Sequence, residues 1–459
     1  MTDSCRYLFL KSRSALSRGG MLLCCIVLLS GVVDGQQTLS LEEAVAIALV
    51  NNYDIRLARN DSAVAALDYA YKDAVFYPRI NATAGTAWVR NNQKQEFTSG
   101  MDREGNVVTN NLNAALSLNW TLFDGLKMFA TRQKAEEYIR LGELKIKGQV
   151  VNTIAAVVNT YYGIVREKQQ LRAIEEQMAI SGISLDLAQR KLEIGVGAKP
   201  VVLQSQVDLN AQRAAQLRQQ TVIRQLKETL NQIIAPAPDG IGSGMTLEYE
   251  VTDTIPIDPR ISLEDIREGL ERNNPTLLVT RKSIDIAQIT LQELKADRYP
   301  KLDFNATYNF SRTSNDIALN PVLPVTNRNR GLNYGLTVSI PILNYRNTHR
   351  LIRQAELDIS YRQLLLESQR SALRLDIQRA YDDFLFQQEA LALEDENILL
   401  ARENVDIILE TYRLGNATYL QLREAQKSLE DAYNRLIAAR YATKLAETEL
   451  LRLRGDLVY

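Results

Sequence analysis

Residues 112–122 have the sequence LNAALSLNWTL, in which every even-numbered side chain is apolar and every odd-numbered one is small or polar. This period of two predicts a β-strand with one apolar and one polar face. The same alternation occupies residues 302–311 and 332–340, and a weaker version occupies 80–90. Strands of about ten residues with such faces are typical of a transmembrane β-barrel wall. A soluble sheet with one solvated face alternates in the same way, so the strands alone leave both possibilities open.

If the strands cross a membrane, their apolar side chains should contact lipid. The predicted lipid-facing residues are Leu112, Leu116, Leu118, Trp120, Phe304, Tyr308, Phe310, Tyr334, Leu336, Val338 and Ile340. Residues 91–111 and 312–331 are rich in Asn, Thr, Arg and Gly, and we predict polar loops there, between paired strands.

Beyond the strands, the sequence as a whole consists of two similar halves. Three motifs recur in the same order about 220 residues apart, far longer than the unit of about 20–50 residues in a solenoid. They are Ser40-Leu41-Glu42, Asn51-Asn52 and Tyr77-Pro78 in one half, and Ser262-Leu263-Glu264, Asn273-Asn274 and Tyr299-Pro300 in the other. We predict an internal two-fold repeat with copies at 36–235 and 261–459, joined by an irregular linker at 236–260.

Helical patterns fill the rest of each copy. Ser40 with Glu43, and Ser262 with Asp265, have the spacing of a capping box. Proline-free heptad patterns predict long helices, and glycine ends each one before a return helix. The predicted helices are 40–76, 126–194 and 198–234 in the first copy, and 262–298, 346–414 and 418–454 in the second. The fold is therefore expected to be mainly α with a transmembrane β part.

The N-terminus predicts export. Arg13 and Arg18 precede an apolar run at 21–33, which is shorter than the about 20 residues that a spanning helix needs, so residues 1–35 are predicted to be a signal peptide. All three cysteines lie within this segment, which removes disulfides and cysteine metal sites from the exported chain. The 54 basic side chains are balanced by 55 acidic ones, so the chain has no excess of positive charge to bind nucleic acid.

Four strands cannot close a membrane barrel, and an open edge in lipid would leave backbone groups unpaired. Several copies must therefore share one barrel if these strands span a membrane. Two copies give eight strands, whose interior side chains largely fill, and three give 12 around a wet lumen. We favour the homotrimer.

The order of helix, two strands, long helix, glycine turn and return helix, repeated once, resembles the TolC-like outer-membrane efflux family over the whole mature chain. The motifs at 40–53, Tyr77-Pro78, Asn273-Asn274-Pro275, Tyr299-Pro300 and residues 412–420 carry the resemblance. It implies a trimer whose 12-stranded barrel in the outer membrane of a Gram-negative-type bacterium continues into a 12-helix periplasmic tunnel. It also implies a periplasmic adaptor and an inner-membrane pump as partners.

The resemblance assigns roles at the glycine turns. Acidic residues after the second turn ring the tunnel mouth in that family; the matching positions here are Gln421 and Glu424, with Val201 and Gln204 in the first copy. An ordinary solvated position for Glu424 remains an alternative. Gly195, Gly197, Gly415 and Thr418 are the predicted adaptor-docking tips.

Catalysis is not expected. His349 is the single histidine, and Asp382-Asp383 lies in a heptad pattern typical of a solvated helix face. No phosphate loop, metal-ligand cluster or nucleophile–base set is present in the sequence, so we predict no enzyme, no cofactor and no metal. We predict a passive exit duct in an efflux or type I secretion system. The alternative is a secreted coiled-coil scaffold without a membrane barrel.

Overall fold

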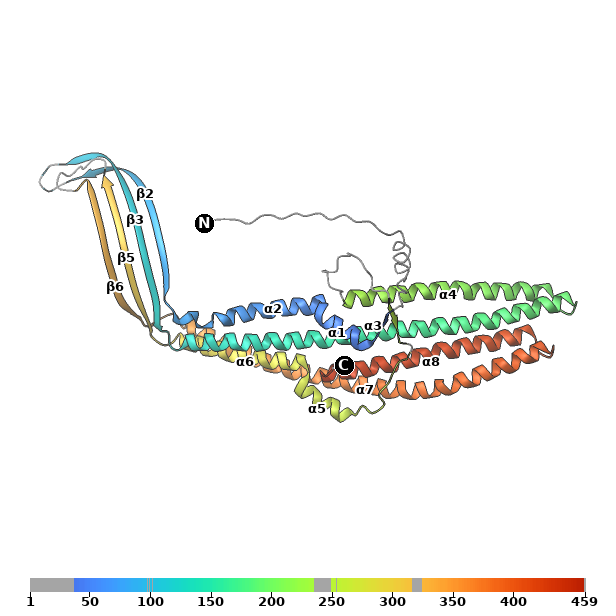
Figure 1. Cartoon of the computed structure of the whole chain (residues 1–459). Helices are drawn as coiled ribbons and strands as arrows, with labels where there is room; N and C mark the ends of the chain where they lie inside the picture. Colours follow the sequence, from blue (N-terminus) through green and yellow to red (C-terminus); the bar gives the residue numbers. More distant parts are fainter. Residues whose placement is uncertain are drawn as a thin grey trace, which may run out of the picture.

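The computed structural model describes residues 37–96, 98, 100, 102–234, 249–252, 254–315 and 324–457. The predicted signal peptide, 1–35, lies outside the described residues. The chain is mainly helical, with a sheet at one end of a long helical body (Figure 1). In chain order the elements are β1 (Gln37–Leu39), α1 (Leu41–Asn51), α2 (Tyr53–Ala70), η2 (Lys72–Phe76), β2 (Arg79–Gln95), β3 (Arg103–Phe123), α3 (Lys127–Glu193), α4 (Lys199–Ile234), β4 (Tyr249–Val251), α5 (Leu263–Asn273), α6 (Pro275–Ala296), β5 (Lys301–Asn315), β6 (Thr326–Ser339), α7 (Asn347–Arg413) and α8 (Tyr419–Arg454).

The four long strands form one antiparallel sheet in the order β2-β3-β5-β6. Each is longer than the apolar alternation predicted, and most of 91–111 and 312–315 is strand rather than loop. The prediction was wrong because the backbone ladder continues past the apolar band, with Lys94 still paired to Glu104. Ile340 lies just beyond β6, since Pro341 next to it has no N–H to donate to a ladder.

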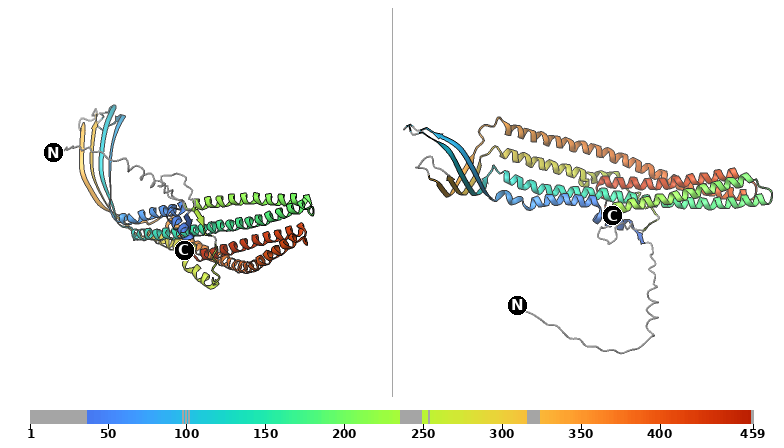
Figure 2. Two further views of the ribbon diagram at one scale, coloured as in Figure 1. Left: turned by 45° about the vertical axis from the view of Figure 1, so that its right-hand side comes forward. Right: turned by 90° about the horizontal axis from the view of Figure 1, so that it is seen from above.

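The helices continue the lateral order of the strands. Near the sheet α2 packs on α3, α3 on α6 and α6 on α7; farther away α4 packs on α3, α3 on α8 and α8 on α7 (Figure 2). Helices α3 and α7, of 67 residues each, run the whole length of the body, about 100 Å. Each short helix covers only part of that length. Among the described helices, none is long and apolar enough to span a bilayer.

An asparagine joins the short helices end to end in each half. The Asn52 side-chain oxygen accepts bonds from the backbone N–H groups of Asp54 and Ile55 at the start of α2, and its amide donates to the Ile233 carbonyl near the end of α4, at 2.7 Å. Asn274 does the same between α6 and α8, donating to the Leu453 carbonyl at 2.8 Å. One buried side chain thus satisfies orphan groups of two helix ends.

The two N-terminal caps differ. Ser40 and Glu43 form the predicted capping box. Ser262 makes no side-chain bond to its helix, so the second predicted box is wrong. Asp265 is one methylene shorter than Glu43, which limits its reach back to the cap. The predicted helices 40–76 and 262–298 are also each divided, at Asn52 and Asn274.

The middle of the body holds the largest buried cluster. Tyr161 of α3 is fully buried and donates to the Leu39 carbonyl at 2.8 Å, and its oxygen accepts from the Thr252 N–H. These bonds fix a parallel pairing of β1 with β4. Part of the predicted irregular linker is therefore ordered strand, because Tyr249 and Val251 are buried against this cluster. Residues 236–248 lie outside the described residues.

We expect Asn52→Ala to lower the free energy of unfolding by about 2 kcal/mol, since it removes a helix cap and leaves the Ile233 carbonyl without its donor. Urea unfolding followed by circular dichroism measures the change. Asn51→Ala is the matched control, because the Asn51 side chain bonds to none of the described residues. Equal effects of the two substitutions would contradict the joining role.

Candidate functional site: the sheet faces and the helical tips

The strand register places the predicted lipid-facing side chains of the sheet on one face. Leu116, Tyr308 and Leu332 share one cross-strand row, and Trp120, Phe304 and Leu336 share another. Ile340, beyond the ladder, is 58% exposed. Leu336 and Tyr334 are also exposed, at 64% and 75%, so no element among the described residues covers the apolar face. A large exposed apolar face of this kind marks an interaction surface.

The opposite face is polar and bonded across strands. Thr121 donates to Asp303 at 2.7 Å, and Asn333 donates to Asn309 at 3.2 Å. Where this face meets the helices, a cavity of about 790 Å³ is lined by polar groups that include Arg79, Asn119 and Asp303. The sheet therefore has a face suited to hydrocarbon and a face suited to water.

Both lateral edges of the helical body carry unpartnered apolar stripes. On α7, Phe386, Leu393, Leu400 and Ile407 recur every seventh residue and are exposed at 63%, 63%, 58% and 57%. On α4, at the other edge, Leu203, Val207 and Leu217 are exposed at 57%, 59% and 66%. Heptad spacing is the pattern of a helix that packs against another helix.

At the end distant from the sheet, two glycine turns connect the helices. Gly195 and Gly415 have φ values of 78° and 87°, a left-handed conformation that favours glycine at a helix end. A Cβ on Gly197 would lie 2.7 Å from the Leu192 nitrogen, so the turn has no room for one. Thr418 caps α8. These turns expose large aliphatic side chains, namely Ile194, Val196, Leu414 and Leu420.

A polar cluster near the tips, which the sequence analysis missed, links the two helical hairpins. Asp208 of α4 accepts from the Tyr419 hydroxyl at 2.8 Å and pairs with Arg423 at 3.3 Å, both on α8. We call Asp208, Tyr419 and Arg423 the tip cluster. Lys191 at the end of α3 adds a second link, donating to the Tyr412 carbonyl at 2.5 Å.

Burial raises the pKa of Tyr419 above its ordinary value, and the hydrogen bond to Asp208 acts in the same direction. The phenol therefore keeps its proton at physiological pH and can donate to the Asp208 carboxylate. This makes the Tyr419–Asp208 contact a hydrogen bond to a charged acceptor, the stronger kind.

The predicted mouth residues lie around the tip cluster but differ in their bonding. Gln204 donates to Asp208 at 2.9 Å and so orients its carboxylate. The Gln421 side chain completes a capping box with Thr418 instead of standing free. The Val201 carbonyl accepts from Ser205, and Glu424 is exposed beside Arg423. A ring role for these four residues stays a prediction.

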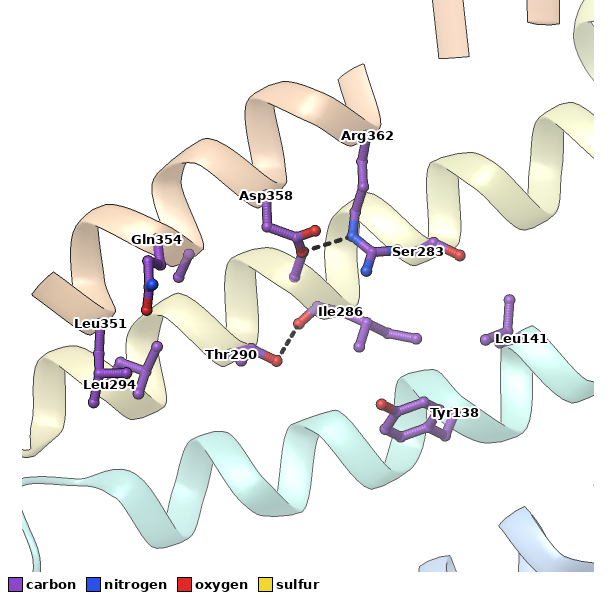
Figure 3. A pocket seen from close by; sticks show the side chains of 12 residues that line it. Tyr138, Leu141, Ser283, Ile286, Thr290, Leu294, Leu351, Gln354, Asp358 and Arg362 are labelled. Atoms are coloured by element: carbon purple, nitrogen blue, oxygen red, sulfur yellow. Dashed lines mark hydrogen bonds and ion pairs between the residues drawn. The ribbon is translucent and has the colours of Figure 1, made fainter. Parts of the chain in front are cut away.

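Little in the described residues suits catalysis. His349 is exposed on the first turn of α7, and no group of three His, Cys, Asp or Glu that could hold a metal occurs in the described part of the chain. A groove of about 450 Å³ lies between α3, α6 and α7 (Figure 3). Apolar side chains dominate its lining, and its charged groups, Asp358 and Arg362, pair with each other at 2.8 Å. We find no reactive constellation there.

Comparisons with known proteins agree on one family. The family described as "Outer membrane efflux protein" matches residues 44–235 and 267–456. The chain is similar to the outer membrane protein TolC of Vibrio cholerae, with 23% identity covering 83% of this chain and 82% of that protein. It is also similar to the alkaline protease secretion protein AprF of Pseudomonas aeruginosa, with 21% identity covering 87% and 82%.

A solved structure of the outer-membrane channel OprN has the same fold. Its TM-score is 0.70 at 17% identity, and the match covers 91% of this chain and 90% of that one.

Proposed function

Because the chain belongs to the outer membrane efflux protein family, and so is an outer-membrane channel component of a tripartite efflux or type I secretion system, we propose that three copies form one continuous water-filled duct. The predicted family and outer-membrane location are confirmed. The alternative of a secreted scaffold without a membrane barrel finds no support. The observation that carries the proposal is the incompleteness of the single chain at both lateral edges.

The sheet edges favour a shared barrel. In the described part of the chain, strands β2 and β6 each pair with a single neighbour, which leaves a row of unpaired backbone groups along each outer edge. Such groups cannot face hydrocarbon, so β6 of one copy is proposed to pair with β2 of the next. Three copies then give a 12-stranded barrel, with the apolar face toward lipid and the polar face toward the lumen.

The helices also favour a closed ring of three copies. The exposed heptad stripe of α7 lies at one edge of the body and the apolar stripe of α4 at the other, so neighbouring copies can cover both. With four helices across each copy at any height, three copies form a 12-helix tunnel. The helices follow the same lateral order as the strands, and the order of elements recurs in the two halves of the chain. Both features support an internal two-fold repeat.

The proposed partners follow from the tips. Tripartite systems place an adaptor and an inner-membrane pump below the outer-membrane component, and the exposed aliphatic side chains beside Gly195, Gly197, Gly415 and Thr418 offer the adaptor an apolar contact. We assign selection of the cargo to the pump. The tunnel supplies passage, without chemistry.

We further propose that the tip cluster restrains the tunnel mouth. Asp208 reaches past α3 to join α4 to α8, so the two hairpins cannot separate at the tip while its bonds hold. Glu424 beside it is proposed to contribute a carboxylate from each copy to the mouth. Breaking the tip cluster should therefore widen the duct.

To test the trimer, Leu400→Glu places a charge in the α7 stripe, and we expect loss of the trimer on size-exclusion chromatography with light scattering. Desolvating an unpaired carboxylate in a helix seam is costly. Lys427→Glu is the control, because Lys427 is exposed on α8, which lies between α3 and α7 rather than at an edge. A trimer that survives Leu400→Glu would refute this seam.

To test the lipid face, Leu336→Arg should cost about 2–4 kcal/mol near the bilayer midplane and abolish recovery from the outer-membrane fraction. Thr337→Arg is the matched control, since its side chain is on the opposite, polar face of the same strand. Equal recovery of both variants would remove the support for a membrane-facing sheet.

To test the tip cluster, Tyr419→Phe removes a charge-assisted bond of about 1.5 kcal/mol from each copy, so the ratio of open to restrained mouths should rise about tenfold per copy. Single-channel conductance in planar bilayers reports the change, and Asp208→Asn should act in the same direction. Tyr441→Phe, which loses a bond to the Asn159 carbonyl in the middle of the body, is the control and should conduct like the wild type. Unchanged conductance in Tyr419→Phe would exclude a restraint there.

A further inference from the structure

The sheet carries an unexpected set of cations on its apolar face. In the strand register Arg312 of β5 lies directly opposite Arg328 of β6, and Arg330 is one row nearer the helices, opposite Phe310. All three side chains are exposed. Arg312 shares its row with Leu112, so these arginines are on the face with the lipid-contacting residues. We call the three the outer arginine cluster.

The position of the cluster along the strands is defined by the apolar rows. From Leu302 to Phe310 the apolar-face side chains of β5 are apolar for about eight residues, roughly 26 Å along the strand. This is comparable with the apolar band of about 25 Å on a membrane barrel. The cluster begins where the band ends, on the side away from the helices, which is the outer-leaflet side of the proposed barrel.

The cluster needs an explanation because like charges directly opposite on adjacent strands are destabilising. None of the three arginines forms an ion pair with an acidic side chain of the described residues. On the polar face, where water would screen them, β5 and β6 instead carry Asn, Ser, Thr and one Gly at 305–313 and 327–333. Among the described residues, no acidic side chain neutralises these cations, and their position allows a ligand beside the membrane surface to do so.

We propose that the outer arginine cluster binds the phosphate groups of an anionic glycolipid of the lipid A class in the outer leaflet. Guanidinium groups bind phosphate oxygens in bidentate fashion, and a phosphate between Arg312 and Arg328 would replace their repulsion with two charge-assisted contacts. The acyl chains of the same lipid would lie on Leu116, Tyr308 and Leu332, which form a row nearer the helices. Basic clusters at a membrane interface recognise anionic lipid in this way. The inference rests on the proposed barrel.

The test compares lipid A with its enzymatically dephosphorylated form, bound to the purified detergent-solubilised trimer and measured by native mass spectrometry. The variant Arg312→Gln/Arg328→Gln/Arg330→Gln should bind lipid A about tenfold more weakly and lose the preference for the phosphorylated form. The corresponding triple Lys variant, which keeps charge without the bidentate geometry, should fall between. Arg79→Gln, on the polar face, should bind like the wild type.

Two results would overturn the inference: equal binding of phosphorylated and dephosphorylated lipid by the wild type, or full displacement of lipid A by inorganic phosphate at the same concentration. Trimer content and bilayer conductance are measured on the same samples. If the wild type forms no conducting trimer, the proposed function fails. If conducting trimers form without phosphate discrimination, the lipid site alone fails.

Discussion

The architecture depends on matching two helices of unequal length. Helices α3 and α7 have 67 residues each, whereas α4 and α8 have 36, so each long helix would lose its neighbour halfway along if the shorter one simply ended. Asn52 and Asn274 solve this by binding the carbonyl end of one short helix and capping the start of the next. The lateral order set by the strands can then persist to the tips. Because the lateral order of the elements is the same along the whole length, the molecule has the same two open edges at every height. The rotation that relates neighbouring copies can therefore close the sheet and the helical body together.

The passage from sheet to helix is made under backbone strain in both halves. Gly125 and Leu126 precede α3 with positive φ values, and Tyr345 and Arg346 precede α7 in the same way. A non-glycine residue in this region costs of order 1 kcal/mol or more. At Gly125 glycine is required in addition by space, since a Cβ would lie 2.4 Å from the Ala296 carbonyl oxygen. The strain recurs at matching positions, which indicates that the sharp turn between a tilted strand and an axial helix demands it.

Sequence periodicity revealed those parts of the fold in which apolar side chains pack against neighbouring helices. The α8 seam is an example: Leu422, Leu429, Thr443 and Leu450 follow a heptad and are all buried. Periodicity does not reveal how deeply small or polar side chains are buried. Gln177, Ser181 and Ser184 are among the most buried residues of α3, which lies between α4 and α8, yet their pattern carries no apolar signal. The strand ends beyond the apolar band were missed for the same reason.

The candidate functional residues also differ in how far the sequence predicts them. The predicted sheet faces follow directly from a period of two, whereas the tip cluster joins Asp208 to Tyr419 and Arg423 across two distant helices, a pairing that no local pattern encodes. The second capping box was predicted from spacing alone and is absent, since the Ser262 side chain makes no bond to its helix.

The distribution of packing determines where this molecule can move. Its two largest buried clusters are in the middle, around Tyr161 and Leu230 and around Phe384 and Leu450. Toward the tips the buried apolar cluster shrinks to Val405, Ala425 and Leu429, and polar contacts take over. Apolar contacts lose free energy in proportion to the area exposed, whereas a hydrogen bond can be exchanged for water at a net cost of about 1 kcal/mol. Opening therefore has its lowest cost at the tips and its highest at the middle, which makes the tunnel mouth the natural moving part of an otherwise rigid duct.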